Sequence, residues 1–336
     1  MTSMIVALRL LAASQVLLFG CALGLSKNPW PIRTLGAMLA LAVIGYLIVP
    51  LTQSLPGPVH LAMVTAANAI PFVLLLFVWV LFEDERPLPW PVLLLGIVYL
   101  AGSAASRGLG VTDDVGLLAI TIQILKLAFA GAAIAIVWRG READLVEERL
   151  KLRRLFTAGT GVAVVAVVIA ELVTVWQVPA LLELFGMAGM LLLALAINLA
   201  FLHLNPTFVL TGRRAAKLQP NVSDPLLGAL IRLMTEERVY ADHDLRVASL
   251  ASRLNVPEHR LRRAINQQLG YRNFNQFVNA YRIEEAARRL ESEPRSPILT
   301  IALDVGFRSI SSFNAAFRTA YHLSPSQFRA QLRTES

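Results

Sequence analysis

Cysteine and charge are scarce in this sequence, and each shortage excludes a class of chemistry. One cysteine, Cys21, stands among 336 residues, so the chain has no intrachain disulfide and no zinc site built from cysteines. Only 16% of the residues are charged and 56% are hydrophobic, which is too apolar for a soluble protein of ordinary composition. No group of catalytic or metal-ligating side chains gathers along the apolar runs. We therefore expect no cofactor, no metal and no enzymatic activity.

The composition changes near Asn205. Apolar runs crowd residues 1–204, whereas residues 205–336 hold 19 basic and 12 acidic side chains, a net charge of +7 out of +8 for the whole chain. A basic surface of this kind fits phosphate or anionic lipid as a partner. We divide the chain into a membrane domain (1–204), a juxtamembrane linker (205–223) and a folded domain (224–336).

Seven apolar runs are long enough, or nearly so, to cross about 30 Å of hydrocarbon at about 1.5 Å per residue. All five tryptophans lie at or near the ends of these runs, where the amphipathic indole ring favours the headgroup layer. The sequence therefore predicts an all-α membrane domain, a seven-transmembrane helix bundle. The runs are approximately Met4–Leu25, Thr34–Gln53, Val59–Phe82, Pro89–Ser106, Val115–Trp138, Leu155–Trp176 and Ala180–Leu204.

Lysine and arginine are unevenly distributed between the two sets of loops, and this predicts the orientation. With the N-terminus outside, the outer loops carry only Arg107. The odd number of spans then places the C-terminal domain in the cytoplasm. We expect a multi-pass protein of the cytoplasmic membrane. The inner loops carry Lys27, Arg33, Arg86, Arg139, Arg141, Arg149, Lys151, Arg153 and Arg154, and the exit from the last span adds Arg213, Arg214 and Lys217.

The first run has a second interpretation, as a cleaved signal peptide. Arg9 precedes a short apolar stretch, and Leu18 to Cys21 loosely resembles a lipoprotein cleavage site. Cleavage would leave six spans and send the C-terminal domain outside, against the distribution of basic residues. We therefore favour an uncleaved first span.

Ionisable residues within the spans are candidate sites, because burying a charge in lipid is costly. Lys126 lies in the middle of the fifth run and Glu171 in the outer third of the sixth, where the pair would neutralise each other or flank a ligand cavity. In the alternative, which we weigh slightly higher, Lys126 extends to the interface and Glu171 sits near the headgroups. The outer loops are too short for a separate sensory domain, so a stimulus would act inside the bundle or through the bilayer.

The C-terminal domain begins with a capped helix and continues with a helix-turn-helix pattern. Asp224 and Pro225 read as N-cap and first-turn proline. A helix over 247–254, a break at 255–257 and a helix over 258–269 have the spacing of a helix-turn-helix. Ala251 allows the two helices to cross closely. The wedge between the helices is predicted to contain Leu250, Leu254, Val256, Leu261 and Ile265.

The same pattern recurs 51 to 52 residues later, which is harder to explain by chance than a single match. The second unit spans about 297–322 and the first about 245–270. Phe274, Phe277, Val278, Tyr281 and Leu290 lie at helical spacing between them and predict a rigid connecting helix. The repeated positions in the second unit are Ile301, Ala302, Val305, Gly306, Phe307, Phe313 and Phe317.

Residues 245–329 resemble the C-terminal DNA-binding domain of the AraC/XylS family of bacterial transcription regulators. The most specific stretch is Ile301-Ala302, Val305-Gly306-Phe307, Ser312-Phe313, Phe317 and the run from Leu323 to Arg329. The resemblance covers about a third of the chain. It implies binding to double-stranded promoter DNA by two helices in successive major grooves, with RNA polymerase and a second copy of the chain as further expected partners.

Two positions depart from the family pattern. His322 stands where the family usually has glycine, a position that we expect to need a left-handed backbone. Ala315 stands where a basic residue is frequent in the second reading helix. We therefore expect the second unit to bind DNA less tightly or to read less sequence than the first.

Helical phasing predicts which side chains face DNA. In each reading helix two apolar residues face inward, and the remaining polar residues are left for the groove or the phosphates. Arg262 and Arg263 are the best candidates for base contacts, because the guanidinium fork matches guanine O6 and N7. For any single position, a solvated helix surface is the competing interpretation. The full set is His259, Arg260, Arg262, Arg263 and Asn266 in the first helix, and Arg308, Ser309, Ser311, Ser312, Asn314 and Arg318 in the second.

These patterns favour a membrane-anchored transcription regulator that responds to a small lipophilic molecule or a membrane signal. Two other classes stay open: a receptor or transporter whose helical tail binds a protein partner, and a membrane enzyme with a regulatory tail. The charged loop from Arg139 to Arg154 either contacts the DNA-binding domain or lies as a helix on the membrane surface, and we favour the second interpretation.

Overall fold

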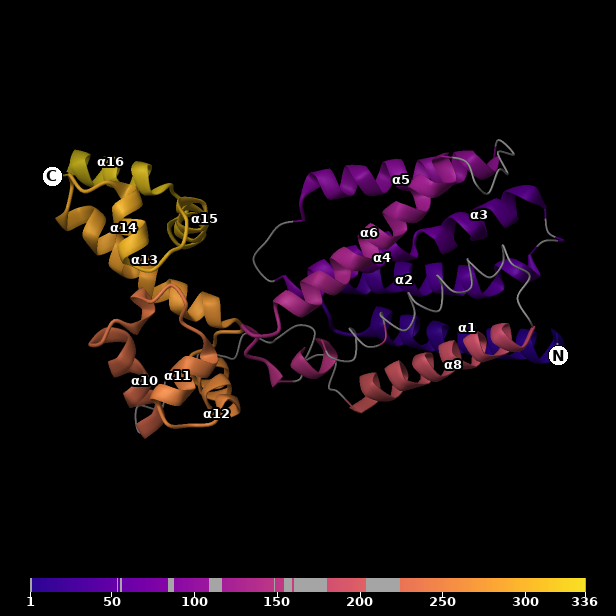
Figure 1. The fold of residues 1–336 in the computed structure, drawn as a ribbon, viewed down its shortest axis with the longest axis horizontal. Helices are drawn as coiled ribbons and strands as arrows, with labels where there is room; N and C mark the ends of the chain where they lie inside the picture. The colour runs from indigo at the N-terminus through magenta and orange to yellow at the C-terminus, as the bar shows by residue number, and fades with distance from the viewer. Residues whose placement is uncertain are drawn as a thin grey trace. The chain divides into compact units, whose positions relative to one another are not determined.

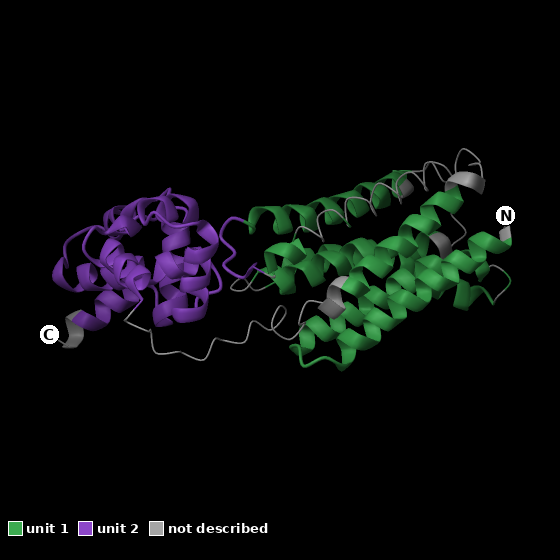
Figure 2. Ribbon diagram, turned by 90° about the horizontal axis from the view of Figure 1, so that it is seen from below, with its two compact units in different colours: residues 1–141, 148–212 green, residues 142–147, 213–336 purple. Residues whose placement is uncertain are grey.

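The structure is a computed structural model that describes residues 2–52, 54, 56–83, 88–108, 117–147, 149–153, 159, 180–203 and 224–335. Within these ranges it is helical, and the only strand-like pairing is an isolated antiparallel bridge between Asp144 and Asn273. The chain forms two compact units (Figure 2). Unit 1 contains residues 1–141 and 148–212, and unit 2 contains residues 142–147 and 213–336.

Unit 1 is built from long apolar helices. α1 packs against α2 and α8, and α4 packs against α6 (Figure 1). The helices are α1 (Thr2–Leu25), α2 (Trp30–Ile48), the short 3-10 helix η1 (Val49–Leu51), α3 (Gly57–Asn68), α4 (Ile70–Phe82), α5 (Trp90–Gly108), α6 (Leu117–Arg139) and α8 (Ala180–His203).

Fewer helices qualify as membrane spans than the sequence predicts. Three helical stretches in the described residues are long and apolar enough to cross a bilayer, namely Ser3–Leu25, Trp30–Leu51 and Ile120–Arg139. A fourth is added if the bent pair α3 and α4 counts as one span. Trp90–Ser106 and Glu183–Leu199 are shorter apolar helices, and the predicted run Leu155–Trp176 lies almost entirely outside the described residues. The seven-span bundle thus stays a prediction.

The third predicted span is a bent pair of helices. It consists of α3 and α4, which meet at an angle of 44°. Pro71 is the second residue of α4, and a proline has no backbone N–H to continue the hydrogen-bond ladder, so the helix breaks before it. The Tyr99 hydroxyl from α5 donates a 2.6 Å hydrogen bond to the carbonyl oxygen of Asn68, the last residue of α3.

Unit 2 contains short amphipathic helices. As predicted, Asp224 caps the first of them, because its carboxylate accepts a 3.0 Å hydrogen bond from the Leu226 amide. The elements are α10 (Pro225–Thr235), η2 (Val239–Ala241), α11 (Val247–Arg253), α12 (Glu258–Arg263), the π-helical turn η3 (Ala264–Gln268), α13 (Phe274–Ser292), α14 (Ile298–Asp304), α15 (Ile310–Tyr321) and α16 (Pro325–Glu335).

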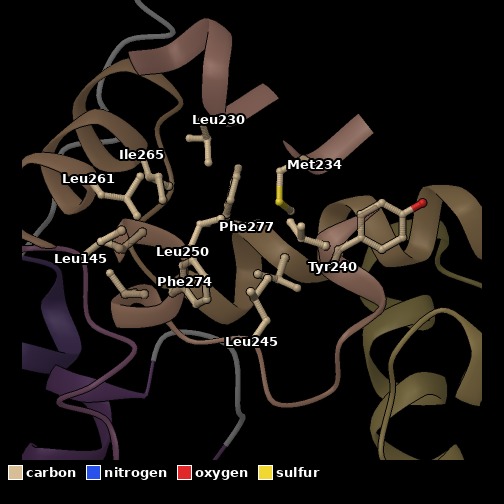
Figure 3. Close-up of a cluster of buried hydrophobic side chains, with 14 of the residues drawn as sticks. Leu145, Leu230, Met234, Tyr240, Leu245, Leu250, Leu261, Ile265, Phe274 and Phe277 are labelled. Atoms are coloured by element: carbon tan, nitrogen blue, oxygen red, sulfur yellow. The ribbon is translucent and has the colours of Figure 1, made fainter. Parts of the chain in front are cut away.

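Two apolar cores hold unit 2 together, and α13 belongs to both. Phe274, Phe277 and Val278 at its start pack with α10, α11 and α12. Ile283 and Leu290 in its second half pack with α14 and α15. A single helix shared by two cores cannot bend without disturbing both, as expected for the predicted connecting helix. Figure 3 shows part of the first core.

Candidate nucleic-acid interface

The two helix-turn-helix units have the same turn. The first helix of each unit ends in a residue with positive φ, Asn255 (51°) in the first unit and Gly306 (100°) in the second. In the first turn the Val256 amide donates to the Ala251 carbonyl, and in the second the Phe307 amide donates to the Ala302 carbonyl, both at 3.0 Å. This is the hydrogen bond of a Schellman cap. The backbone thus repeats along with the sequence.

The predicted wedge residues face inward. Leu250, Leu261 and Ile265 are fully buried in the first unit, as Phe313 and Phe317 are in the second. Leu254 and Val256 are half-buried against the same core. Because these apolar side chains face inward, the polar residues of α12 and α15 lie on the outer faces of the two helix-turn-helix units.

The two reading helices end in different residue types but in the same backbone conformation. Gly270 (φ 79°) ends the first, and His322 (φ 59°) stands 52 residues later at the end of the second. Each amide donates to the carbonyl four residues back, Asn266 and Arg318 respectively. The prediction that His322 needs a left-handed backbone is therefore confirmed.

Arg282 on α13 fastens the loop before the first unit. Its Nε and Nη2 donate to the carbonyl oxygens of Tyr240 and Asp242 at 2.7 and 2.8 Å. Burial lowers the pKa of its guanidinium to about 10, against the raising effect of Asp242, so Arg282 stays protonated at neutral pH. Its charge supports the scaffold and is not free for DNA.

In the first reading helix, His259, Arg260 and Arg263 are exposed, as a DNA-contacting surface requires. Within the described part of the chain no ion pair holds His259 or Arg260, whereas Arg263 lies 3.5 Å from the carboxylate of Glu147. Asn266 is half-buried, and its side-chain amide donates to the Tyr271 carbonyl at 2.9 Å. Asn266 therefore supports the helix end, and its amide is committed within the domain.

Arg262, a predicted base contact, lies against residues 142–147. Its side chain is only 11% exposed, and Nη1 donates to the carbonyl oxygens of Glu142 (3.0 Å) and Asp144 (2.6 Å). Nη2 donates to the Glu258 carboxylate one helical turn earlier, at 2.9 Å. In this arrangement the guanidinium is occupied by protein oxygens and is not presented to a DNA groove.

The second reading helix presents hydroxyls where the first presents arginines. Ser309 is the N-cap of α15, and its Oγ accepts from the Ser312 amide. The Ser312 hydroxyl donates in turn to the Ser309 carbonyl at 2.9 Å, so both serines shape the helix start. Arg308 pairs with Asp244. Ser311 and Arg318 are exposed and Asn314 is half-exposed, which leaves them on the outer surface of the domain.

The C-terminal part of the chain is similar in sequence to known helix-turn-helix proteins. A family model described as a helix-turn-helix domain matches residues 250–331. MtrA of Neisseria gonorrhoeae, an HTH-type transcriptional regulator, is 32% identical over 108 residues, which are 32% of this chain and 34% of MtrA. The C-terminal domain of AraT, a response regulator from Geobacillus stearothermophilus, is 33% identical over 32% of this chain and 85% of that domain, with a TM-score of 0.29.

Residues 250–331 form an AraC-type helix-turn-helix domain. The chain spans about a third of the length of MtrA, so the comparison speaks for this domain alone. Residues 142–147, which contact Arg262, lie outside the matched stretch. Their contact with the AraC-type domain is a feature of this chain that the comparison does not cover.

The remaining candidate residues are the ionisable ones of the predicted spans. Lys126 is half-buried in α6, and Glu171 lies outside the described residues, so the predicted pair is untested. Within the described residues of unit 1, a different ion pair is present, and the sequence analysis did not predict it. Arg9 on α1 donates to the carboxylate of Glu183 on α8 at 2.8 Å and to the Leu47 carbonyl at 3.2 Å.

A signal for the Arg9–Glu183 pair was present in the sequence. Both residues lie near the beginning of a predicted span that enters from the same side, the first and the seventh, and therefore at similar depth. A second link between the same two helices is the side-chain amide of Asn198, which donates to the Gln15 carbonyl at 2.9 Å. The sequence analysis singled out charged residues near the middle of a span. Comparing the depths of opposite charges on different predicted spans would have identified Arg9 and Glu183.

Proposed function

We propose that this chain is a membrane-anchored transcription regulator that binds promoter DNA in a sequence-specific manner through its C-terminal AraC-type domain. The observation that carries the proposal is the duplicated helix-turn-helix. Its first reading helix has a basic outer face and its second a hydroxyl-bearing one. The helix α13, which is shared between two cores, joins the two units. Arginines suit guanine and phosphate, and hydroxyls and amides suit phosphate and adenine.

The membrane part of the proposal rests on the helices of unit 1. Large apolar side chains on their outer faces are more than half exposed, among them Leu17, Leu18, Ile97, Ile124 and Leu199. Surfaces of this kind are unfavourable in water and favourable in lipid. Together with the basic residues of the predicted inner loops, they support a multi-pass anchor in the bacterial cytoplasmic membrane with the AraC-type domain in the cytoplasm, as the positive-inside rule expects.

DNA binding is tested with the full chain in detergent micelles. Genome-wide crosslinking first identifies bound promoter fragments, and gel shifts then compare wild type with Arg260→Ala/Arg263→Ala. We expect the double variant to lose about 10- to 100-fold in affinity, since each arginine contact to base or phosphate contributes about 1 kcal/mol or more. Arg232→Ala on α10 is the control, because it removes an exposed charge outside the reading helices.

An unchanged gel shift in the double variant would reject specific DNA reading and favour a receptor or transporter whose tail binds a protein. The sensory role of unit 1 is tested separately, by deleting residues 1–204 and measuring promoter output. Inducible transcription at the wild-type level without the bundle would reject a sensory role for it and leave DNA binding intact.

A further inference from the structure

Residues 142–147, here called the strap, are part of unit 2 although the rest of that unit begins 66 residues later in the chain. The strap forms the antiparallel bridge Asp144–Asn273 just before α13. The Leu145 amide donates to the Arg272 carbonyl at 3.0 Å, and the Phe274 amide donates to the Ala143 carbonyl at 2.8 Å. Two backbone hydrogen bonds of good geometry define a docked position for the strap.

An apolar anchor and three arginines hold the strap in that position. Leu145 is 1% exposed and lies in the first core beside Leu261 and Phe274 (Figure 3). Arg262 donates to two strap carbonyls, as described above. The acidic residues at both ends meet arginines of the first helix-turn-helix unit, Glu142 with Arg246 at 3.8 Å and Glu147 with Arg263 at 3.5 Å.

The strap therefore takes up side chains that DNA would use. Arg262 and Arg263 are the predicted base contacts of the first reading helix, and the strap offers them two carbonyl oxygens and a carboxylate. Phosphate and guanine also bind arginine through oxygen or nitrogen acceptors. Strap and DNA are thus alternative ligands of the same guanidinium groups.

The strap follows the end of α6, and the residues after it are fastened within unit 1. Arg149 is 1% exposed and donates to the carbonyl oxygen of Phe82, the last residue of α4, at 3.1 Å. Arg153 donates to the same carbonyl at 3.3 Å and to the Val137 carbonyl near the end of α6 at 3.2 Å. Guanidinium groups are favourable at helix C-termini, where carbonyl groups lack partners. A movement of α4 against α6 would therefore pull on the strap.

We propose that the strap is a built-in inhibitor of the AraC-type domain: docked, it occupies Arg262 and restrains Arg263, and a rearrangement of α4 and α6 in the membrane unit releases it. This inference rests on the proposed DNA-binding function. In the docked state the first reading helix binds DNA without Arg262 and with a restrained Arg263. Release frees both side chains for DNA and raises promoter affinity.

A reversible disulfide tests the docked state directly. Asp144 and Asn273 form the type of antiparallel pair whose Cα atoms lie about 4.5 Å apart, within the range that a disulfide spans. Asp144→Cys/Asn273→Cys is made in the full chain with Cys21→Ala, and crosslinking is measured by mass spectrometry. We expect near-complete oxidation in detergent and about tenfold weaker promoter binding than in the reduced state of the same protein. The single-cysteine variants are the controls and should not respond to oxidation.

A second comparison distinguishes inhibition from a merely structural role of the strap. Leu145→Ala removes the apolar anchor and should tighten promoter binding by about tenfold. In this background Arg262→Ala should cost about tenfold in affinity, whereas in the oxidised double-cysteine protein it should change affinity less than about twofold. A strap that only completes the core would instead make Leu145→Ala bind DNA more weakly.

Each outcome decides a different point. Failure to crosslink, equal binding in the oxidised and reduced states, or tighter binding when oxidised would overturn the inhibitory strap. Absence of promoter binding in the reduced double-cysteine protein and in wild type alike would overturn the proposed function, and the inhibitory role with it.

Discussion

The two helix-turn-helix units share a backbone and differ in nearly everything that faces outward. Their turns carry the same hydrogen bonds, and their reading helices end in the same left-handed conformation. The first unit has an arginine-rich face and a core completed by Leu145 from the strap, whereas the second has a serine-rich face and a core of residues from α13 to α16. A duplicated scaffold can therefore serve two different functions. The buried apolar residues determine the backbone of the turn, and the exposed residues can differ between the two copies.

The largest difference between the units should appear at the turn itself. Gly306→Ala should destabilise the second unit by about 3 kcal/mol or more, because φ is 100° and a Cβ would lie 2.7 Å from the Tyr240 carbonyl oxygen. Asn255→Gly at the equivalent turn should change stability by less than about 1 kcal/mol. Hydrogen exchange of α14 and α11 amides in the full chain measures both. An effect of Gly306→Ala as small as that of Asn255→Gly would show that neither the positive φ nor the nearby Tyr240 carbonyl constrains the second turn.

The reading faces should differ next. Arg263→Ala in the first unit should weaken promoter binding by about 5- to 100-fold, as expected for loss of a base contact, and should relax specificity at one base pair. Arg318→Ala in the second should weaken binding by less than about fivefold and lower its salt dependence, as loss of a phosphate contact does. Gel shifts at two salt concentrations measure this. A larger loss of affinity in Arg318→Ala than in Arg263→Ala would show that the second helix-turn-helix unit makes more of the base contacts.

The helix ends offer a smaller test. His322→Gly should stabilise the second unit by about 1 kcal/mol, because glycine adopts φ near 59° without steric cost. Gly270→Ala should destabilise the first unit by a similar amount. Hydrogen exchange near the ends of α15 and η3 reports each change separately. A loss of stability in His322→Gly would show that the imidazole itself contributes to the helix end.

Acid should affect the C-terminal domain slightly through two carboxylates, Asp224 at the start of α10 and Glu293 at the end of α13. A hydrogen bond from Gln268 lowers the pKa of Asp224, and hydrogen bonds from Arg289 and Ser296 lower the pKa of Glu293. The folded pKa lies below the unfolded one, so each contribution is present at neutral pH. It is lost as the pH falls from the ordinary pKa, 3.8 for Asp224 and 4.5 for Glu293, through the lowered value. Asp224→Asn should reduce the acid sensitivity of α10, and Glu293→Gln that of the end of α13.

Hydrogen exchange at two acidic pH values measures the acid response, with the two substitutions compared in the same protein. A pH dependence unchanged by both substitutions would assign the acid sensitivity to other groups. Because both carboxylates lie at the surface, we expect these effects to be smaller than those at the turns and helix ends.

Much of the C-terminal fold was predictable, since its information is local. The helices and their buried faces were predicted from the spacing of apolar residues, Leu250, Leu261 and Ile265 in the first unit and Ile301, Phe313 and Phe317 in the second. Asp224 predicted a helix cap, and His322 predicted a left-handed helix end. The break before Pro71 was not predicted, because the long apolar run over 59–82 read as one span, although a proline that removes a backbone donor was a signal for it.

Contacts between distant segments were not predictable in the same way. Phasing gave Arg262 an outward position on α12, and only folding showed which oxygens it meets there. The charged loop was assigned to the membrane surface from its composition. That interpretation is wrong for residues 142–147, because the buried Leu145 and two backbone hydrogen bonds place them in unit 2.

The sequence by itself determined the apolar first half, the two helix-turn-helix units and the residue types on their reading faces, because helical period, caps and glycine positions act over a few residues. The tertiary structure alone decided that α13 joins two cores and that a segment from between two apolar runs occupies Arg262. Such pairings depend on which distant surfaces are complementary once the helices have formed, and no local pattern in the chain encodes that.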